Sequence, residues 1–207
     1  VVNHMANERD AATTFPGDNT LAAYESDPSY WERQQLYGDL DEGLFGPNDF
    51  HSPQCIMNYR DRQEVIEGRI CGGGDDPGLP DLRDTVPGDN WVLDQRKQYI
   101  QSLYDLGVRG FRLDAAKHMP NGAIQYFVPE EVAENSHIFA EIITTGGVDD
   151  TEYQAFLEPY LRELSPAFGA YDFPLLNAIK QAFGFGNSLA TLAQPYADGN
   201  ALENNRA

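Results

Sequence analysis

From Trp91 onward the sequence alternates between helical and strand patterns, and this alternation limits the fold more than any other feature. Apolar residues recur at helical spacing as far as Leu106, and Gly107 follows where a glycine often ends a helix. Strand and helix patterns then take turns over residues 108–114, 121–134, 137–143, 150–164, 167–173, 175–183 and 189–193. Units of about thirty residues with this order are typical of parallel strands joined by helical crossovers. The sequence therefore predicts an α/β fold with a parallel sheet.

Residues 7–89 have a different character. They are rich in Asp, Gly, Pro, Asn and Tyr, they contain few periodic apolar runs, and residues 72–78 form a cluster of Gly, Asp and Pro. This composition predicts a loop-rich excursion with at most short strands.

The charge balance excludes several classes of partner. The 207 residues include 33 acidic and 14 basic side chains, for a formal net charge of -19. Such a chain would repel nucleic acid phosphates and anionic membrane surfaces, so we expect neither as a partner. The sequence has no run of about 18 apolar residues that could span a membrane. Its first residues lack the basic and apolar regions of a signal peptide.

Two cysteines, Cys55 and Cys71, lie sixteen positions apart in a region rich in Gly and Pro. In an oxidising compartment they are close enough in sequence to clip one loop with a disulfide. Two free buried thiols are the alternative. The cysteines do not form the patterns that bind zinc.

Two carboxylates follow the first two predicted strands of the alternating region. Asp114 and Glu141 lie 27 positions apart, about one strand–helix unit, so adjacent parallel strands would bring them to the same rim. Retaining glycoside hydrolases use such a pair, with one ionised nucleophile and one protonated acid. Arg112 shares a strand face with Asp114 and would keep it ionised, whereas the apolar neighbours of Glu141 would favour its protonated form. A salt bridge of Arg112 with Asp114 at the rim, beside an exposed Glu141, is the structural alternative.

Several stretches carry a family resemblance. Residues 110–118, Gly-Phe-Arg-Leu-Asp-Ala-Ala-Lys-His, resemble the second signature region of the α-amylase family, glycoside hydrolase family 13. Four other stretches resemble further motifs of the family. Residues 1–4 resemble the end of its first region, and residues 78–82 the motif that closes its domain B. Residues 139–143 resemble its third region, and residues 171–175 the turn after its sixth strand. Ala140 precedes Glu141 where the family more usually has Gly. The resemblance covers essentially the whole chain.

This resemblance implies part of a (β/α)8 TIM barrel, from about the end of strand 3 to helix 6, with an irregular domain B inserted after strand 3. The implied division is the end of barrel strand 3 at 1–4, domain B at 5–86 and part of the catalytic barrel at 87–207. Strands 1, 2, 7 and 8 of the family, and its third carboxylate, have no counterpart in the sequence. We therefore expect a partial chain that needs the remainder of its barrel or otherwise self-associates.

The resemblance also implies the chemistry. Asp114 is expected to be the nucleophile, Glu141 the general acid/base, and Arg112 the residue that orients Asp114. The expected reaction is endo-acting, retaining hydrolysis of α-1,4-glucosidic bonds in starch- or glycogen-like glucans. The alternatives are a transglycosylating or maltooligosaccharide-forming relative, and a non-catalytic, self-associating fragment of the enzyme.

Further residues are implied to bind substrate and ions. His4, Lys117, His118 and Tyr59 are expected to contact the α-glucan. A calcium ion is expected between domain B and the barrel, because the matching positions supply the oxygen ligands that this ion prefers: the side chains of Asn3 and Asp81 and the carbonyls of Arg69 and His118. The alternatives are an ordinary solvent-exposed Asp81, and a purely structural role for His4 and His118 as loop histidines whose hydrogen bonds are made within the protein.

Three properties complete the expectation from the family. Cys55 and Cys71 match a disulfide found in domain B of some amylases. The family is secreted, so an extracellular location is expected. Arg112 also matches one chloride ligand of chloride-dependent members, but the other ligands would lie beyond residue 207, so chloride stays undecided.

Overall fold

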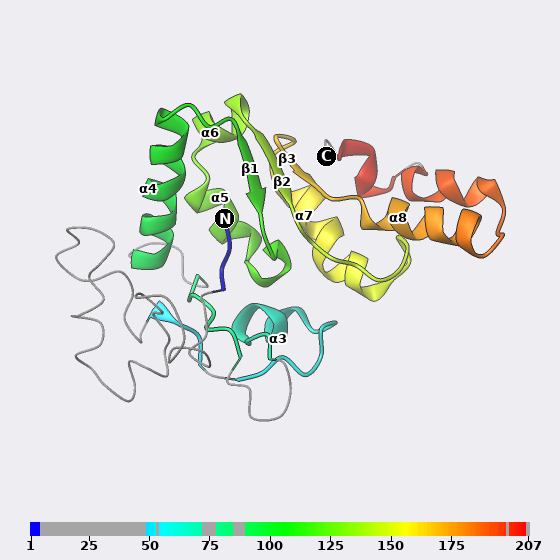
Figure 1. The fold of residues 1–207 in the computed structure, drawn as a ribbon, viewed down its shortest axis with the longest axis horizontal. Coiled ribbons are helices and arrows are strands. Elements are labelled where there is room, and N and C mark those ends of the chain that lie inside the picture. Colours follow the sequence, from blue (N-terminus) through cyan, green and yellow to red (C-terminus); the bar gives the residue numbers. More distant parts are fainter. Residues whose placement is uncertain (5–48, 53, 72–77, 85–89, 198, 206–207) are drawn as a thin grey trace, which may run out of the picture.

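The computed structural model describes residues 1–4, 49–52, 54–71, 78–84, 90–197 and 199–205. Its centre is a three-stranded parallel sheet in the order β1-β2-β3, formed by Gly110–Leu113, His137–Ala140 and Phe168–Ala170. The α4 helix lies on the β1 side of this sheet, whereas α7 and α8 lie toward β3 (Figure 1). Most of the domain B range expected at 5–86 falls outside the described residues.

Helices connect and flank the strands. The α-helices are α3 (Arg62–Glu67), α4 (Trp91–Asp105), α5 (Asn121–Phe127), α6 (Glu130–Asn135), α7 (Glu158–Glu163) and α8 (Phe173–Ile179). Helical segments of 3-10 or π type are η4 (Ala116–His118), η5 (Tyr153–Leu157), η6 (Lys180–Gly184), η7 (Leu189–Tyr196) and η8 (Ala201–Asn204). Among the residues described, no helix has the length and apolar character needed to cross a membrane.

The sheet register follows the predicted alternation of faces. Leu113 pairs with Ala140, and Ala140 pairs in turn with Ala170. In β1 the side chains of Phe111 and Leu113 are buried, whereas Arg112 between them points to the other, more exposed face. The three strands therefore end together at one edge, which is the edge where Asp114 and Glu141 follow.

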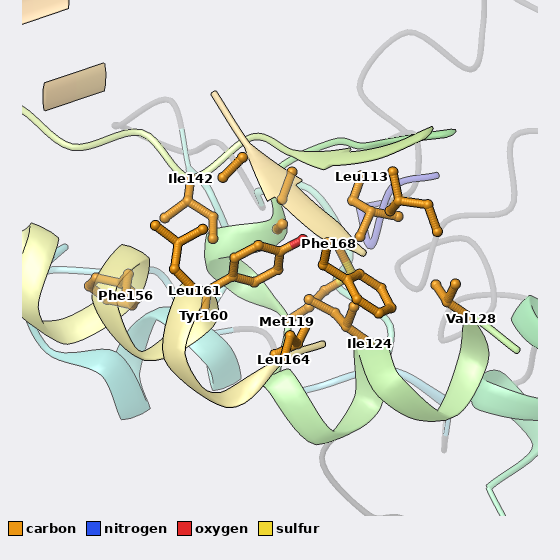
Figure 2. Close-up of a cluster of buried hydrophobic side chains, with 14 of the residues drawn as sticks. Leu113, Met119, Ile124, Val128, Ile142, Phe156, Tyr160, Leu161, Leu164 and Phe168 are labelled. Atoms are coloured by element: carbon orange, nitrogen blue, oxygen red, sulfur yellow. The ribbon is translucent and has the colours of Figure 1, made fainter. Parts of the chain in front are cut away.

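The buried face of the sheet packs against the helices. Figure 2 shows Leu113 from β1 and Phe168 from β3 gathered with apolar side chains of α5 and α7. Tyr160 on α7 is fully buried, and its hydroxyl donates a hydrogen bond to the carbonyl of Gly169 in β3 (3.2 Å). Packing in this core holds each strand in place relative to the helices. It therefore also sets where the residue after each strand lies.

The structure refines the predicted elements in several places. The helix before Gly107 is present as α4, and Gly107 has the positive φ of 100° that favours glycine. The helix expected over 121–134 is instead two helices, because Pro129 lies at the start of α6 and lacks the amide proton that would continue α5. The strands are shorter than the predicted ranges, because each one ends where the chain leaves the sheet at its carboxyl edge.

The loop-rich region contains one helix that the sequence did not predict. The α3 helix is six residues long, too short to show a helical period, and begins where the Asp61 side chain accepts from the amides of Gln63 and Glu64. The expectation of at most short strands in this region was therefore wrong for residues 62–67. Its neighbours Cys55 and Cys71 form the expected disulfide.

The N-terminal residues lie beside β1 (Figure 1). The Val1 amine donates to the carbonyl of Arg112 (2.8 Å), and the Val1 carbonyl accepts from the amide of Asp114 (2.7 Å). This is the bonding pattern of a parallel ladder. Three residues further on, His4 forms an isolated antiparallel bridge with Asp81, which ties the N-terminal segment to the loop-rich region.

Candidate active site

Asp114 and Glu141 follow neighbouring strands at the same edge of the sheet. Because Leu113 pairs with Ala140, the next residue on each strand is at the same level, and the amide of Glu141 donates to the carbonyl of Leu113 (2.8 Å). The side chain of Asp114 is 37% exposed and that of Glu141 is 23% exposed. Both carboxylates are therefore accessible at the rim.

Arg112 joins the two carboxylates. Its guanidinium lies 2.5 Å from Asp114 Oδ1 and 2.9 Å from Glu141 Oε1. Some desolvation opposes the charge, but the nearby Glu141 and Asp114 raise the pKa of Arg112 above its ordinary value. The arginine is thus a permanent cation that contacts both carboxyl groups. The rim salt bridge considered as an alternative is present, but it includes Glu141 as well.

The turn after β1 brings a backbone donor to Glu141. Ala115 has a φ of 49°, in the left-handed region, and is the only described non-glycine residue with positive φ. This conformation costs an alanine roughly 1 kcal/mol or more. It directs the Ala115 amide at Glu141 Oε2 (3.3 Å). Local strain at a rim turn of this kind is often found next to functional groups.

An open cleft of about 470 Å³ is lined by Glu141, whereas Asp114 and Arg112 are not among its lining residues. Four of the predicted site residues are among those that line it, together with others that the sequence did not single out: Tyr59, Lys117, His118 and Glu141, with Ile70, Ala115, Ile143, Thr145 and Glu152. The predicted substrate residues of the loop-rich region and of the sheet rim therefore meet at one cavity.

His4 lies behind this cleft. Its ring packs edge-on against that of His118 at 4.7 Å between centroids, and its Nδ1 lies 3.0 Å from Asp81 Oδ1. The His4 side chain is 6% exposed, so in this structure it supports His118 and contacts Asp81 and does not line the cleft.

His118 is held as a neutral imidazole. Its Nδ1 lies 3.1 Å from the carbonyl of Val65, which can only accept, so Nδ1 carries the proton. Burial, followed by the neighbouring His4, lowers the pKa of His118 to about 3. At neutral pH His118 is therefore an uncharged wall of the cleft and cannot serve as its acid.

Lys117 is the cation of the cleft. It is paired with Glu152, whose Oε1 lies 3.4 Å from Lys117 Nζ, and both side chains are only 9% exposed. Burial lowers the pKa of Lys117, and the charge of Glu152 opposes that shift. Sequence reasoning missed Glu152, because it lies inside a helical pattern 35 positions from Lys117 and no local signal links the two.

Two of the four expected calcium ligands, the side chains of Asn3 and Asp81, lie together at one buried point. The Asn3 amide donates to Asp81 Oδ1 (2.7 Å), and its own oxygen accepts from Arg96. Asp81 is fully buried, burial raises its pKa, and its Oδ2 has no hydrogen-bond partner among the described residues. The Arg69 guanidinium is linked to this point through His51, whose carbonyl accepts from it (3.3 Å) and whose amide donates to the Asp81 carbonyl (2.9 Å). The Arg69 carbonyl, which is the expected ligand, accepts from the Ile56 amide (3.0 Å).

The His118 ring contacts that of His4, which in turn contacts Asp81, whereas the expected ligand is the His118 carbonyl. Within the described ranges, no cluster of three His, Cys, Asp or Glu side chains is arranged to hold a metal ion. The expected set is of another kind, since it combines one carboxylate and one amide with two backbone carbonyls. Asp81 Oδ2 is the atom that fits a hard cation, because a buried carboxylate oxygen needs a partner and His51 Nε2, at 4.0 Å, is beyond hydrogen-bond distance.

The chain is similar to proteins of known name. It is 43% identical over 209 aligned residues to an alpha-amylase of Aeromonas hydrophila, a match that covers 100% of this chain and 44% of that protein. An alpha-amylase of Tenebrio molitor is 32% identical over 124 residues, which cover 54% of this chain and 24% of that protein. The chain thus spans less than half the length of these curated relatives. No protein-family model matches it.

Solved structures share the fold. An alpha-amylase from Malbranchea cinnamomea matches with a TM-score of 0.58 at 21% identity, over 83% of this chain and 33% of that one. A cyclomaltodextrin glucanotransferase, CldA, matches with a TM-score of 0.59 at 23% identity, over 76% and 29% of the two chains. At these identities the likeness concerns the fold alone, and it confirms that the sheet is part of a (β/α)8 barrel.

Proposed function

Because this chain belongs to the α-amylase family, we propose that it carries the nucleophile and the general acid/base of an endo-acting, retaining α-1,4-glucan hydrolase. The activity is proposed for the whole protein, since the chain spans 44% of its Aeromonas hydrophila relative. The observation that carries the proposal is the contact of Arg112 with both Asp114 and Glu141, of which Glu141 lines an open cleft. The substrate we propose is a starch- or glycogen-like glucan.

The rim residues have distinct roles in this mechanism. Asp114 attacks the anomeric carbon and forms a glycosyl ester, while Glu141 donates a proton to the leaving oxygen. Glu141 then takes a proton from water, and that water releases the sugar from Asp114 with overall retention. Arg112 keeps the attacking oxygen in place, because its guanidinium contacts Asp114 Oδ1 directly.

Product analysis tests this reaction. We expect the full-length protein to release a range of oligosaccharides from soluble starch, each first formed as the α-anomer. Chromatography of early products and proton NMR of their anomeric signals make the measurement. A β-anomer formed first would refute retention. Products cut only from chain ends would refute endo-action, and cyclic or lengthened glucans would favour a transglycosylating enzyme.

We also propose that calcium binds where the loop-rich region meets the barrel. The ligands would be the side chains of Asn3 and Asp81 and the carbonyls of Arg69 and His118. A bound calcium would supply structural cross-linking there, since these residues belong to four separate segments. The buried Oδ2 of Asp81 supports the proposal, because among the described residues it has no hydrogen-bond partner and His51 Nε2 lies 4.0 Å away. The Arg96 contact with the Asn3 side-chain oxygen would have to rearrange or share that oxygen.

Removal of calcium should destabilise the full-length protein. At calcium concentrations near 100 times the dissociation constant, binding stabilises the folded state by about 2.7 kcal/mol, and chelation should remove this contribution. Thermal unfolding with and without chelator measures it. Asp81→Asn should unfold at nearly the same temperature in both conditions, whereas Asp149→Asn, a matched change at an exposed loop position, should respond as the parent does. An equal calcium response in Asp81→Asn and parent would refute the site.

The domain division and the location are proposals as well. We propose that residues 1–4 end barrel strand 3, that 5–86 form domain B, and that 87–207 belong to the barrel. The ladder of Val1 with β1 supports the first assignment. The Cys55–Cys71 disulfide supports an extracellular location, because disulfides persist in oxidising compartments.

A further inference from the structure

A buried ion pair forms part of the cleft wall. Lys117 and Glu152 both line the cleft, yet each side chain is only 9% exposed. The Lys117 ammonium also lies 4.7 Å from the ring centroid of Phe156 and 5.8 Å from that of Tyr59. A lysine at a rim can usually extend into water, so this one is held in place by its surroundings.

Glu152 is itself fixed by the loop that follows β2. Its Oε2 accepts from both the amide and the hydroxyl of Thr145, each at 3.0 Å, which leaves Oε1 for Lys117. The Glu152 amide is in turn bound to Asp150 Oδ1 (2.8 Å). Each oxygen of the carboxylate therefore has a separate task, one toward the loop and one toward the lysine.

The loop in question starts at Glu141. Residues 141–145 run from the proposed acid/base to the residue that anchors Glu152, and Glu141, Thr145 and Glu152 all line the same cleft. Glu152 thus ties the strand end that carries Glu141 to the turn that carries Lys117. Charge-assisted hydrogen bonds of this kind are stronger and more directional than neutral ones.

We propose that Glu152 is a positioning residue that holds the Lys117 ammonium at the cleft wall for contact with glucan hydroxyls. The inference rests on the proposed function, because it assigns Lys117 to substrate binding. It differs from a purely structural role in one respect. A structural Glu152 would affect stability alone, whereas a positioning Glu152 would affect glucan binding only while Lys117 is present.

A double-mutant cycle tests the difference. Binding of a maltooligosaccharide is measured by calorimetry in the full-length protein carrying Glu141→Gln, so that the ligand is not hydrolysed. We expect Glu152→Gln and Lys117→Met each to weaken binding about tenfold, the loss typical of one charged hydrogen bond. The combined variant should bind no more weakly than Lys117→Met alone. Additive losses would overturn the proposal.

Kinetics and milder variants give a second readout. With Glu141 intact, Glu152→Gln should raise KM about tenfold and leave kcat within about twofold, as expected when uniform binding is lost. Glu152→Asp should recover part of the affinity, because it keeps the charge. Thr145→Val, which removes one of the two bonds to Oε2, should weaken binding about threefold, and only while Lys117 is present. This variant also tests the proposal if Glu152→Gln fails to fold.

The matched control is Glu158→Gln. Glu158 pairs with Arg162 on α7 at 2.8 Å and does not line the cleft, so this variant should bind glucan as the parent does. A Glu152→Gln protein that melts at a lower temperature but binds normally would overturn the positioning role. If the parent itself binds no maltooligosaccharide, the proposed function fails; if the parent binds and the cycle is additive, only this inference fails.

Discussion

Asp114→Asn in the full-length protein is expected to lower kcat on soluble starch by about 10⁴-fold or more, a loss typical of removing a catalytic nucleophile. An amide cannot form the glycosyl ester, and no other carboxylate described at this rim contacts Arg112 except Glu141. Folding should be retained, because Arg112 keeps its contact with Glu141 Oε1 at 2.9 Å. Reducing-end release and circular dichroism make the two measurements.

Glu141→Gln should cause a loss of similar size on starch but a different one on an activated substrate. A maltoside with a nitrophenol leaving group needs little protonation, so the variant should still form the glycosyl enzyme and then stall. Mass spectrometry would detect the accumulated adduct on Asp114. Asp105→Asn, on the exposed end of α4, is the matched control and should leave kcat unchanged. Starch hydrolysis at more than a tenth of the parental rate in either rim variant would contradict the assigned roles.

The sequence was sufficient where a pattern is local. The alternation around Arg112 predicted both the strand and its faces, and the spacing to Glu141 predicted adjacent strand ends, which the pairing of Leu113 with Ala140 confirms. Pro129 could have predicted the break between α5 and α6. Each of these features depends on residues within one strand–helix unit.

The sequence was insufficient where two distant segments meet. In the sequence, Glu152 is one residue of a helical pattern. Its pairing with Lys117 becomes visible only in the folded structure. His4 was expected to contact the sugar. Its side chain instead contacts Asp81, which lies 77 positions away in the loop-rich region. Arg96 fits the apolar stripe of α4 by spacing alone, yet it is a buried charge. Its partners come from the N-terminus, from the segment before α4, and from Met119 and Phe127 on the far side of β1 in the sequence.

Arg96→Met is accordingly expected to lower the free energy of unfolding by about 3–5 kcal/mol, the cost of breaking a buried ion pair by removing one partner. Arg96 is 5% exposed and donates to Asp84 Oδ2 (3.3 Å), to the Val2 carbonyl (3.2 Å) and to the Asn3 side chain. Without the guanidinium, Asp84, which is 1% exposed, would keep only the longer contact of its Oδ1 with His51 Nε2 (4.0 Å) among the ion pairs of the described residues. Chemical denaturation at fixed calcium measures the loss.

The combined variant Arg96→Met/Asp84→Asn separates charge from packing. Its second change removes the buried charge of Asp84, so it should recover about 2 kcal/mol relative to Arg96→Met, because the single variant's loss is mainly the desolvation of Asp84. Arg162→Met is the control: its side chain is 50% exposed and pairs with Glu158 at 2.8 Å, so about 1 kcal/mol or less should be lost. A combined variant no more stable than Arg96→Met would instead assign the loss to the arginine's contacts with Val2, Asn3 and the Phe127 ring, 5.3 Å from its guanidinium carbon. The link between the N-terminal segment and α4 would then depend on the shape and hydrogen bonds of Arg96 more than on its charge.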